Sequence, residues 1–142
     1  MKNIAVLGDS LIGLLSALVL SKNKNNIYIF RNTQEDYGRE NIERYFSINL
    51  LSKYMFMKSG IWENIESNGI QPYKKIITWS DTGNEITFNS RSISYDYLGY
   101  IIKESSIKQA IQEKLSKLKN ITIKSIEEVS YIDQSENNVI NF

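Results

Sequence analysis

A glycine turn near the N-terminus carries the clearest chemical signal in this sequence. Gly8 ends the apolar run Asn3 to Leu7, and Gly13 closes the stretch Gly8-Asp9-Ser10-Leu11-Ile12-Gly13. A strand that turns directly into a helix presents free backbone N–H groups and the positive end of the helix dipole, and both favour a bound phosphate. In the dinucleotide fingerprint G-x-G-x-x-G, the first glycine allows the sharp turn and the last lets the helix pack closely. The turn therefore predicts a pyrophosphate-binding site.

Two residues, Ser10 and Arg31, depart from the usual pattern, and Asp9 adds a charge conflict. Ser10 stands where a middle glycine normally lets the backbone approach the pyrophosphate. Arg31 follows the second strand, where an acid normally binds the adenosine ribose. An arginine cannot accept hydrogen bonds from the ribose, but it can pair with a 2′-phosphate, as in NADP-binding proteins; a solvated surface arginine is an equally open interpretation. Asp9 repels a diphosphate unless its carboxylate turns outward.

The elements around the turn predict a β-α-β unit. Asn3 to Leu7 and Ile27 to Phe30 have the length and composition of short buried strands. Leu11 to Leu20 is apolar on nearly every side, which is typical of a buried helix. The whole unit takes about 30 residues, as expected of a crossover between parallel strands. The fold class is therefore α/β, with a Rossmann-type sheet.

The middle of the chain predicts further helices and a hairpin. The polar stretch Asn32 to Glu43 predicts a loop. Ser47 is expected to cap a helix that runs through Lys58, with Gly60 just past its end. The expected apolar face of that helix consists of Ile48, Leu51 and Met55. Trp62 to Asn68 suggests a short helix. The runs Ile76 to Ser80 and Glu85 to Asn89 flank Asp81-Thr82-Gly83-Asn84 and predict a hairpin.

The last third of the chain predicts one more helix between strands. Gly99 to Ile102 is ambiguous, and Ser106 with Gln109 forms a capping-box signature at the start of a helix. Apolar residues at spacings of three and four predict its buried face: Ile107, Ala110, Ile111, Leu115 and Leu118. Ile121 to Ile123 and Val139 to Phe142 have the composition of strands.

The composition excludes several classes of function. The chain has 17 basic and 16 acidic residues, so it lacks the basic surplus expected of a nucleic-acid-binding protein. It has no cysteine and no histidine, which excludes disulfides, thiolate metal sites and Ser-His-Asp catalysis. No apolar run approaches the ~18 residues of a membrane span, and the N-terminal stretch is no signal peptide. We expect a cytoplasmic protein, with peripheral attachment to the inner membrane as the other option.

Beyond the turn, the order of landmarks resembles the flavin-dependent aromatic hydroxylases of ubiquinone biosynthesis, the polyprenyl-methoxyphenol hydroxylase group. The turn and its apolar helix are the first point of likeness. The stretch from Glu43 to Ser52, followed by Ser59-Gly60-Ile61-Trp62, resembles the family's arginine-containing FAD segment and its Leu-Gly-Leu-Trp helix end. Leu98-Gly99-Tyr100-Ile101-Ile102 resembles its Leu-Gly-Tyr-Val-Val segment.

The resemblance implies FAD as cofactor, NAD(P)H as reductant and a small aromatic substrate. Gly8 and Gly13 match the family's pyrophosphate turn, and Arg44 matches its FAD-contacting arginine. Ser10 departs from glycine, Arg31 from the ribose-binding glutamate, and Ser105 from an arginine, which predicts weakened or lost FAD binding. No catalytic residue and no metal ligand is assigned, and the candidate cofactor-binding residues are Gly8, Ser10, Gly13, Arg31 and Arg44.

The family's proteins are much longer than this chain, so residues 1–142 are expected to form a single incomplete FAD-binding domain. Residues 76–97 resemble the first strands of the family's substrate domain. We therefore expect self-association or a separately encoded C-terminal piece as partner. Three readings of function stay open: a part of a flavin monooxygenase, a degenerate non-catalytic fragment that keeps the fold for assembly, and an NADP-binding module that uses Arg31.

Overall fold

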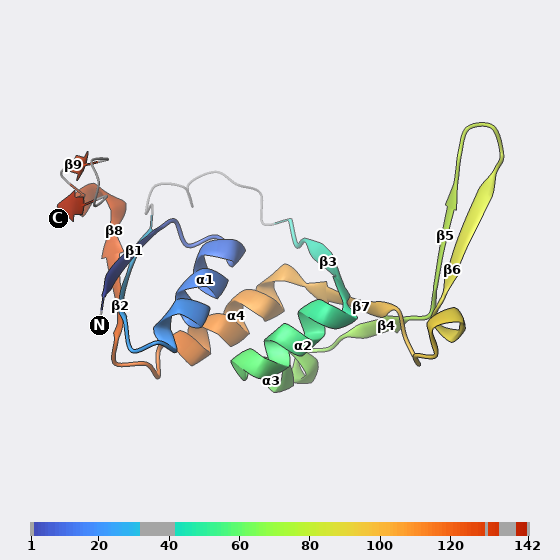
Figure 1. Cartoon of the computed structure of the whole chain (residues 1–142), viewed down its shortest axis with the longest axis horizontal. Helices are drawn as coiled ribbons and strands as arrows, with labels where there is room; N and C mark the ends of the chain where they lie inside the picture. The colour runs from blue at the N-terminus through green and yellow to red at the C-terminus, as the bar shows by residue number, and fades with distance from the viewer. Residues whose placement is uncertain (1, 32–41, 130, 134–138, 142) are drawn as a thin grey trace. The chain divides into compact units, whose positions relative to one another are not determined.

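The computed structural model describes residues 2–31, 42–129, 131–133 and 139–141 (Figure 1). The chain divides into two compact units, one formed by Met1–Ile42 with Ile111–Phe142 and the other by Glu43–Ala110. The loop predicted at Asn32 to Glu43 lies almost wholly outside the described residues.

The first unit is built on a parallel sheet. Strand β1 (Asn3–Leu7) leads through helix α1 (Leu11–Ser21) to β2 (Asn26–Arg31). The two strands are parallel and in register from Asn3 opposite Asn26 to Leu7 opposite Phe30. Strand β8 (Ile121–Ser125) pairs in parallel with the other edge of β2, which gives the order β1-β2-β8. The predicted β-α-β unit and the Rossmann-type α/β fold are confirmed.

Helix α1 buries one side rather than all of its surface. Buried residues of the helix and of β2 form most of the core of this unit, whereas Ile12 and Val19 are 72% and 46% exposed. The expectation of a helix buried all round was wrong, because α1 packs on β1 and β2 through one side. The core residues of this unit are Leu14, Ala17, Leu18, Ile27, Ile29, Phe30, Ile111 and Leu115.

After β8 the chain forms a short 3₁₀ turn, η2 (Ile126–Glu128), and then an antiparallel pair of strands. These are β9 (Tyr131–Asp133) and β10 (Val139–Asn141). The strand predicted at Val139 to Phe142 is confirmed for the described residues, and its partner is β9.

The second unit contains an antiparallel sheet, two helices and a hairpin. The sheet has the order β3 (Tyr45–Asn49), β7 (Gly99–Lys103), β4 (Gln71–Tyr73). Helices α2 (Leu50–Ser59) and α3 (Trp62–Ser67) follow β3, and the 3₁₀ turn η1 (Ser90–Ile93) follows the hairpin. The predicted hairpin is confirmed as β5 (Lys75–Trp79) paired with β6 (Glu85–Asn89).

The start of α2 differs from the prediction. Ser47 lies within β3, and Asn49 is the residue that caps the helix, its side-chain oxygen accepting a hydrogen bond from the Ser52 N–H at 2.8 Å. The predicted apolar face was also wrong, since Leu51 and Met55 are 68% and 55% exposed. The predicted end of the helix is confirmed at Gly60, whose φ of 68° is a left-handed conformation that glycine adopts without strain.

Helix α4 (Glu104–Leu115) begins two residues before the predicted cap. Ser106 lies in the first turn and is buried, so the capping-box interpretation was wrong. The predicted buried face is confirmed at Ile107, Ala110, Ile111 and Leu115, whereas Leu118 is half-buried beyond the helix end. Among the described residues, no helix has both the length and the apolar character needed to cross a membrane.

Candidate functional site

The glycine turn brings the end of β1, the start of α1 and the end of β2 together. Gly8 has a φ of +95°, which favours glycine, and its N–H donates to the carbonyl of Phe30 at 2.7 Å. A Cβ added to Gly13 would lie 2.4 Å from the Gly8 carbonyl oxygen. The close approach of helix and turn that the sequence predicted therefore requires glycine at position 13.

Ser10 has a local structural role that explains its presence. It is the N-cap of α1, and its hydroxyl oxygen accepts a hydrogen bond from the Gly13 N–H at 3.4 Å. At the start of a helix the first N–H groups have no intrahelical partner. The Ser10 hydroxyl takes up the Gly13 N–H. The N–H groups of Leu11 and Ile12 are therefore the ones at the start of the helix that can bind an anion.

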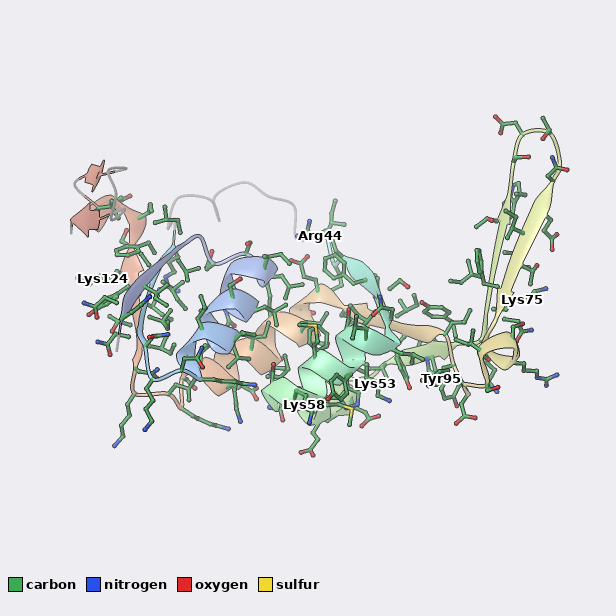
Figure 2. All side chains as sticks on the ribbon, viewed as in Figure 1. Arg44, Lys53, Lys58, Lys75, Tyr95 and Lys124 are labelled. Carbon is green, nitrogen blue, oxygen red and sulfur yellow. The ribbon has the colours of Figure 1, made fainter. Side chains whose placement is uncertain are left out.

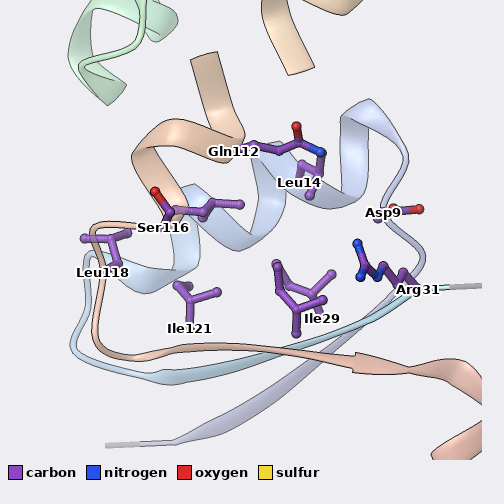
Figure 3. Close-up of a pocket in the computed structure, with 10 residues that line it drawn as sticks. Asp9, Leu14, Ile29, Arg31, Gln112, Ser116, Leu118 and Ile121 are labelled. Atoms are coloured by element: carbon purple, nitrogen blue, oxygen red, sulfur yellow. The ribbon is translucent and has the colours of Figure 1, made fainter. Parts of the chain in front are cut away.

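Arg31 and Asp9 lie at the carboxyl ends of β2 and β1, beside a small cavity (Figure 3). The Arg31 guanidinium points toward the cavity, whereas the Asp9 carboxylate points away from it. The Asp9 side chain is exposed to solvent.

The cavity lies between the helices and the sheet of the first unit and measures about 150 Å³. Its walls combine apolar residues of both layers with polar groups from the turn, β2 and the end of α4. Ligand pockets usually measure roughly 300–1,000 Å³, so this cavity could take only part of a dinucleotide. The lining residues are Asp9, Leu14, Ile29, Arg31, Gln112, Leu115, Ser116, Leu118, Ile121 and Ile123.

Arg44 belongs to the second unit, in which it forms an ion pair. Its Nε and one terminal nitrogen donate to the two carboxylate oxygens of Glu104, at 2.5 and 2.9 Å. Lys108 lies one helical turn further along α4, with its Nζ 3.2 Å from Glu104. Hydrogen bonding from Arg44 lowers the pKa of the Glu104 carboxyl, against the opposing effect of burial, and Lys108 acts in the same direction as Arg44.

A second carboxylate sits beside this pair. Glu43 accepts hydrogen bonds from the hydroxyl and the N–H of Ser105, at 2.7 and 3.3 Å, and these bonds lower the pKa of Glu43. Ser105, which stands where the related family has arginine, is thus occupied with Glu43. Sequence reasoning did not identify a role for Glu104 or for Glu43, because each bonds to a residue about 60 positions away in the sequence.

The structure therefore groups four of the five sequence-predicted site residues and places the fifth in the other unit. The turn of the first unit contains Gly8, Ser10 and Gly13, and Arg31 follows at the end of β2. Arg44 lies at the start of the second unit. Within the described residues, no three acidic side chains gather in a way that could hold a metal ion.

Comparisons with known proteins agree with this picture. No protein-family model matches the chain. It is 19% identical over 124 residues to the 3-demethoxyubiquinol 3-hydroxylase of Escherichia coli (strain K12), a match that covers 85% of this chain and 32% of that protein. The chain thus spans about a third of the length of the curated relative that it matches.

Solved structures of monooxygenases have the same fold. The p-nitrophenol 4-monooxygenase PnpA of Pseudomonas putida DLL-E4 matches with a TM-score of 0.66 at 18% identity, over 94% of this chain and 34% of that one. PqsL of Pseudomonas aeruginosa, described as a probable FAD-dependent monooxygenase, matches with a TM-score of 0.72 at 14% identity, over 99% of this chain and 37% of that one. The resemblance found in the sequence is thereby confirmed: over about a third of their length, FAD-dependent monooxygenases share the fold of this chain.

Proposed function

We propose that this chain is the nucleotide-binding portion of a flavin-dependent monooxygenase and holds the ADP half of FAD. The observation that carries the proposal is the Gly8 to Gly13 turn, in which a helix begins at the carboxyl end of a parallel strand with almost no space between turn and helix. In open α/β sheets, ligands bind outside the carboxyl ends of the strands. The shared fold of monooxygenases supports the same assignment.

The residues of the turn fit a pyrophosphate in part. The N–H groups of Leu11 and Ile12 at the start of α1 would donate to its oxygens, and Gly8 permits the turn that exposes them. Arg44 is the second candidate contact, by resemblance. FAD, when bound, supplies oxygen activation for hydroxylation of an aromatic ring, with NAD(P)H as its reductant. This chain's share of the work is to bind and orient the nucleotide end of the cofactor.

Two residues of the site do not fit FAD well. The Ser10 hydroxyl occupies the Gly13 N–H, and Arg31 offers no acceptor to the ribose hydroxyls. A hydrogen bond to a charged group contributes about 1.5–3 kcal/mol, and each 1.4 kcal/mol corresponds to about tenfold in affinity. We therefore expect the chain to bind FAD weakly, with the loss concentrated at the adenosine end.

Titration of FAD fluorescence tests this proposal. The unmodified chain should quench FAD with a dissociation constant in the micromolar range or weaker, and ADP should compete whereas FMN should not. Arg31→Glu combined with Ser10→Gly should tighten binding by at least about tenfold. Arg91→Glu, which makes the same change of charge at an exposed position of η1, should not. Nanomolar affinity of the unmodified chain would refute the weak-binding claim, and the absence of saturable quenching would refute the proposal.

The second candidate function is NADP binding, which the orientation of Arg31 favours. Its guanidinium points toward the cavity, and Ser125 lies opposite it in the β2–β8 register and on the same face of the sheet. An arginine in this place suits a 2′-phosphate. Tighter binding of 2′-phospho-ADP-ribose than of ADP-ribose, lost in Arg31→Ala, would favour this candidate over the first.

The domain organisation, the partners and the location of the chain are proposed together with FAD binding. Residues 76–97 would begin a substrate domain, and a C-terminal piece or a second copy would supply the surfaces that the chain lacks. A chain that binds neither FAD nor NADP would be the non-catalytic form that keeps the fold for assembly. The location would be the cytoplasm or the surface of the inner membrane.

A further inference from the structure

The cavity of the first unit has a polar end and an apolar body. Arg31 lies at the end nearest the glycine turn, and Leu118 and Ile121 line the opposite end, where the chain passes from α4 to β8 (Figure 3). All the residues that line the cavity belong to the first unit, so its walls come from one compact part of the chain.

The apolar body suits one compact hydrocarbon group. Its walls are aliphatic, because the apolar residues that line it are all leucine and isoleucine. The cavity measures about 150 Å³. An engineered cavity of about 150 Å³, lined by residues of this kind, binds benzene. The volume therefore suits a hydrocarbon group of roughly six carbons. The residues concerned are Leu14, Ile29, Leu115, Leu118, Ile121 and Ile123.

The polar end suits a carboxylate. Side chains alternate along a strand, so Arg31 shares the face of the sheet on which Ile29 lines the cavity, and its guanidinium points inward. Among the described residues, no carboxylate forms an ion pair with this guanidinium. The acidic residue of the lining, Asp9, points its carboxylate away. Parallel N–H donors of a guanidinium match the two oxygens of a carboxylate in geometry as well as in charge.

We propose that this cavity binds a small aliphatic monocarboxylate, whose hydrocarbon part fills the apolar body and whose carboxylate pairs with Arg31. A carboxylate fits better than a phosphate monoester, because one guanidinium balances one negative charge and a phosphate monoester carries nearly two. The inference goes beyond the proposed function, since the phosphate-binding turn uses N–H groups at the start of α1 and not the space between the helices and the sheet.

Two probes of matched shape, cyclohexanecarboxylate and cyclohexanemethanol, test the proposal. Titration of the full chain, ¹³C-labelled at its Ile and Leu methyl groups, locates them by NMR. We expect the acid to saturate in about the millimolar range, with the largest shifts at Ile29, Leu115 and Ile121. It should bind at least about tenfold more tightly than the alcohol. Arg31→Gln should remove this preference, because it weakens the binding of the acid and leaves that of the alcohol unchanged.

Lys124→Gln is the matched control for charge. It removes a positive charge from the neighbouring strand β8, but Lys124 follows Ile123 and so lies on the opposite face of the sheet from the cavity (Figure 2). This variant should keep the preference for the acid. Leu118→Trp should weaken the binding of both probes, because the larger side chain takes up the apolar end of the cavity. Circular dichroism checks that each variant is folded, and the comparison of acid with alcohol in the unmodified chain needs no variant.

Four results would each overturn the proposal. They are the absence of saturable shifts at the cavity methyl groups up to the solubility limit of the acid, equal affinities of acid and alcohol, a preference for the acid that survives Arg31→Gln or is lost equally in Lys124→Gln, and unchanged binding in Leu118→Trp. FAD titration of the same chain is a separate measurement, and its result concerns the glycine turn alone.

Discussion

Replacing Gly13 with alanine would place a methyl group 2.4 Å from the Gly8 carbonyl oxygen, whereas real contacts of this kind essentially never fall below 3.0 Å. The turn or the helix must then move by about 0.6 Å, and the Gly8 N–H is anchored to the Phe30 carbonyl at 2.7 Å. Overpacking of this kind typically costs about 1–3 kcal/mol. Alanine recovers about 1 kcal/mol through its better helix propensity. Because a backbone oxygen cannot step aside as a side chain can, we take the upper end of the cost and expect a net destabilisation of about 2 kcal/mol.

Thermal unfolding followed by circular dichroism measures this effect. A destabilisation of about 2 kcal/mol lowers the Tm by roughly 5–8 °C in a domain of this size. Ile12→Ala is the matched control, since it introduces the same residue at the preceding, 72% exposed position of α1 and should stay within about 0.5 kcal/mol of the wild type. A Gly13→Ala variant as stable as the wild type would refute the close approach of turn and helix.

Three further predictions concern other parts of the chain. The Asn120 side-chain amide donates to the Ser21 and Asn25 carbonyls at 3.0 and 2.7 Å. Asn120→Asp should therefore lower the free energy of unfolding, measured in urea, by about 1–3 kcal/mol. The same change at the exposed Asn23 should leave it unchanged. The pKa of Glu104 is lower in the folded chain than in the unfolded chain, where it is about 4.3. The ionised Glu104 therefore stabilises the fold fully above the unfolded pKa, and this stabilisation is lost as the pH falls through the folded pKa. The Tm should therefore fall more steeply from pH 5 to 3 in the wild type than in Glu104→Gln, and parallel curves would contradict the ion pair. Ile76, Ile86 and Phe88 share one face of the β5–β6 hairpin and are 40–59% exposed, so we expect the chain to self-associate through this face. Light scattering should show an average mass that rises with concentration, and the rise should be smaller in Phe88→Ser than in Thr87→Ser, which changes the other face. A strictly monomeric wild type would contradict this expectation.

The sequence predicted the first β-α-β unit well because its signals are local. A short apolar run, a glycine turn and an apolar helix follow one another within the first 30 residues, and each can be recognised without knowledge of the rest of the chain. The error at α2 had the opposite cause. Tyr45–Asn49 is a strand because it pairs with Gly99–Lys103, about 50 residues later. Nothing near Ser47 reveals that pairing, so the local sequence predicts a helix cap there.

The candidate site shows the same division. Gly8, Gly13 and Arg31 could be found from the spacing of a known fingerprint, and Arg44 from a resemblance. Glu104 could not be found, because an acid at the start of a helix usually interacts with the helix dipole and gives no sign of a partner 60 residues earlier. The departure at Ser10 was visible in the sequence, but its cause, the cap on α1, depends on the orientation of a hydroxyl and required the structure.

The central claim is that the start of α1 binds the phosphates of a nucleotide. Amide chemical shifts of the ¹⁵N-labelled chain during titration with ADP test it directly, since they locate the ligand and do not depend on catalysis. We expect the largest shifts at the N–H groups of Leu11 and Ile12, smaller shifts at Gly8 and Arg31, and saturation in the micromolar to millimolar range. Saturating shifts confined to other residues, or no shifts at millimolar ADP, would contradict it.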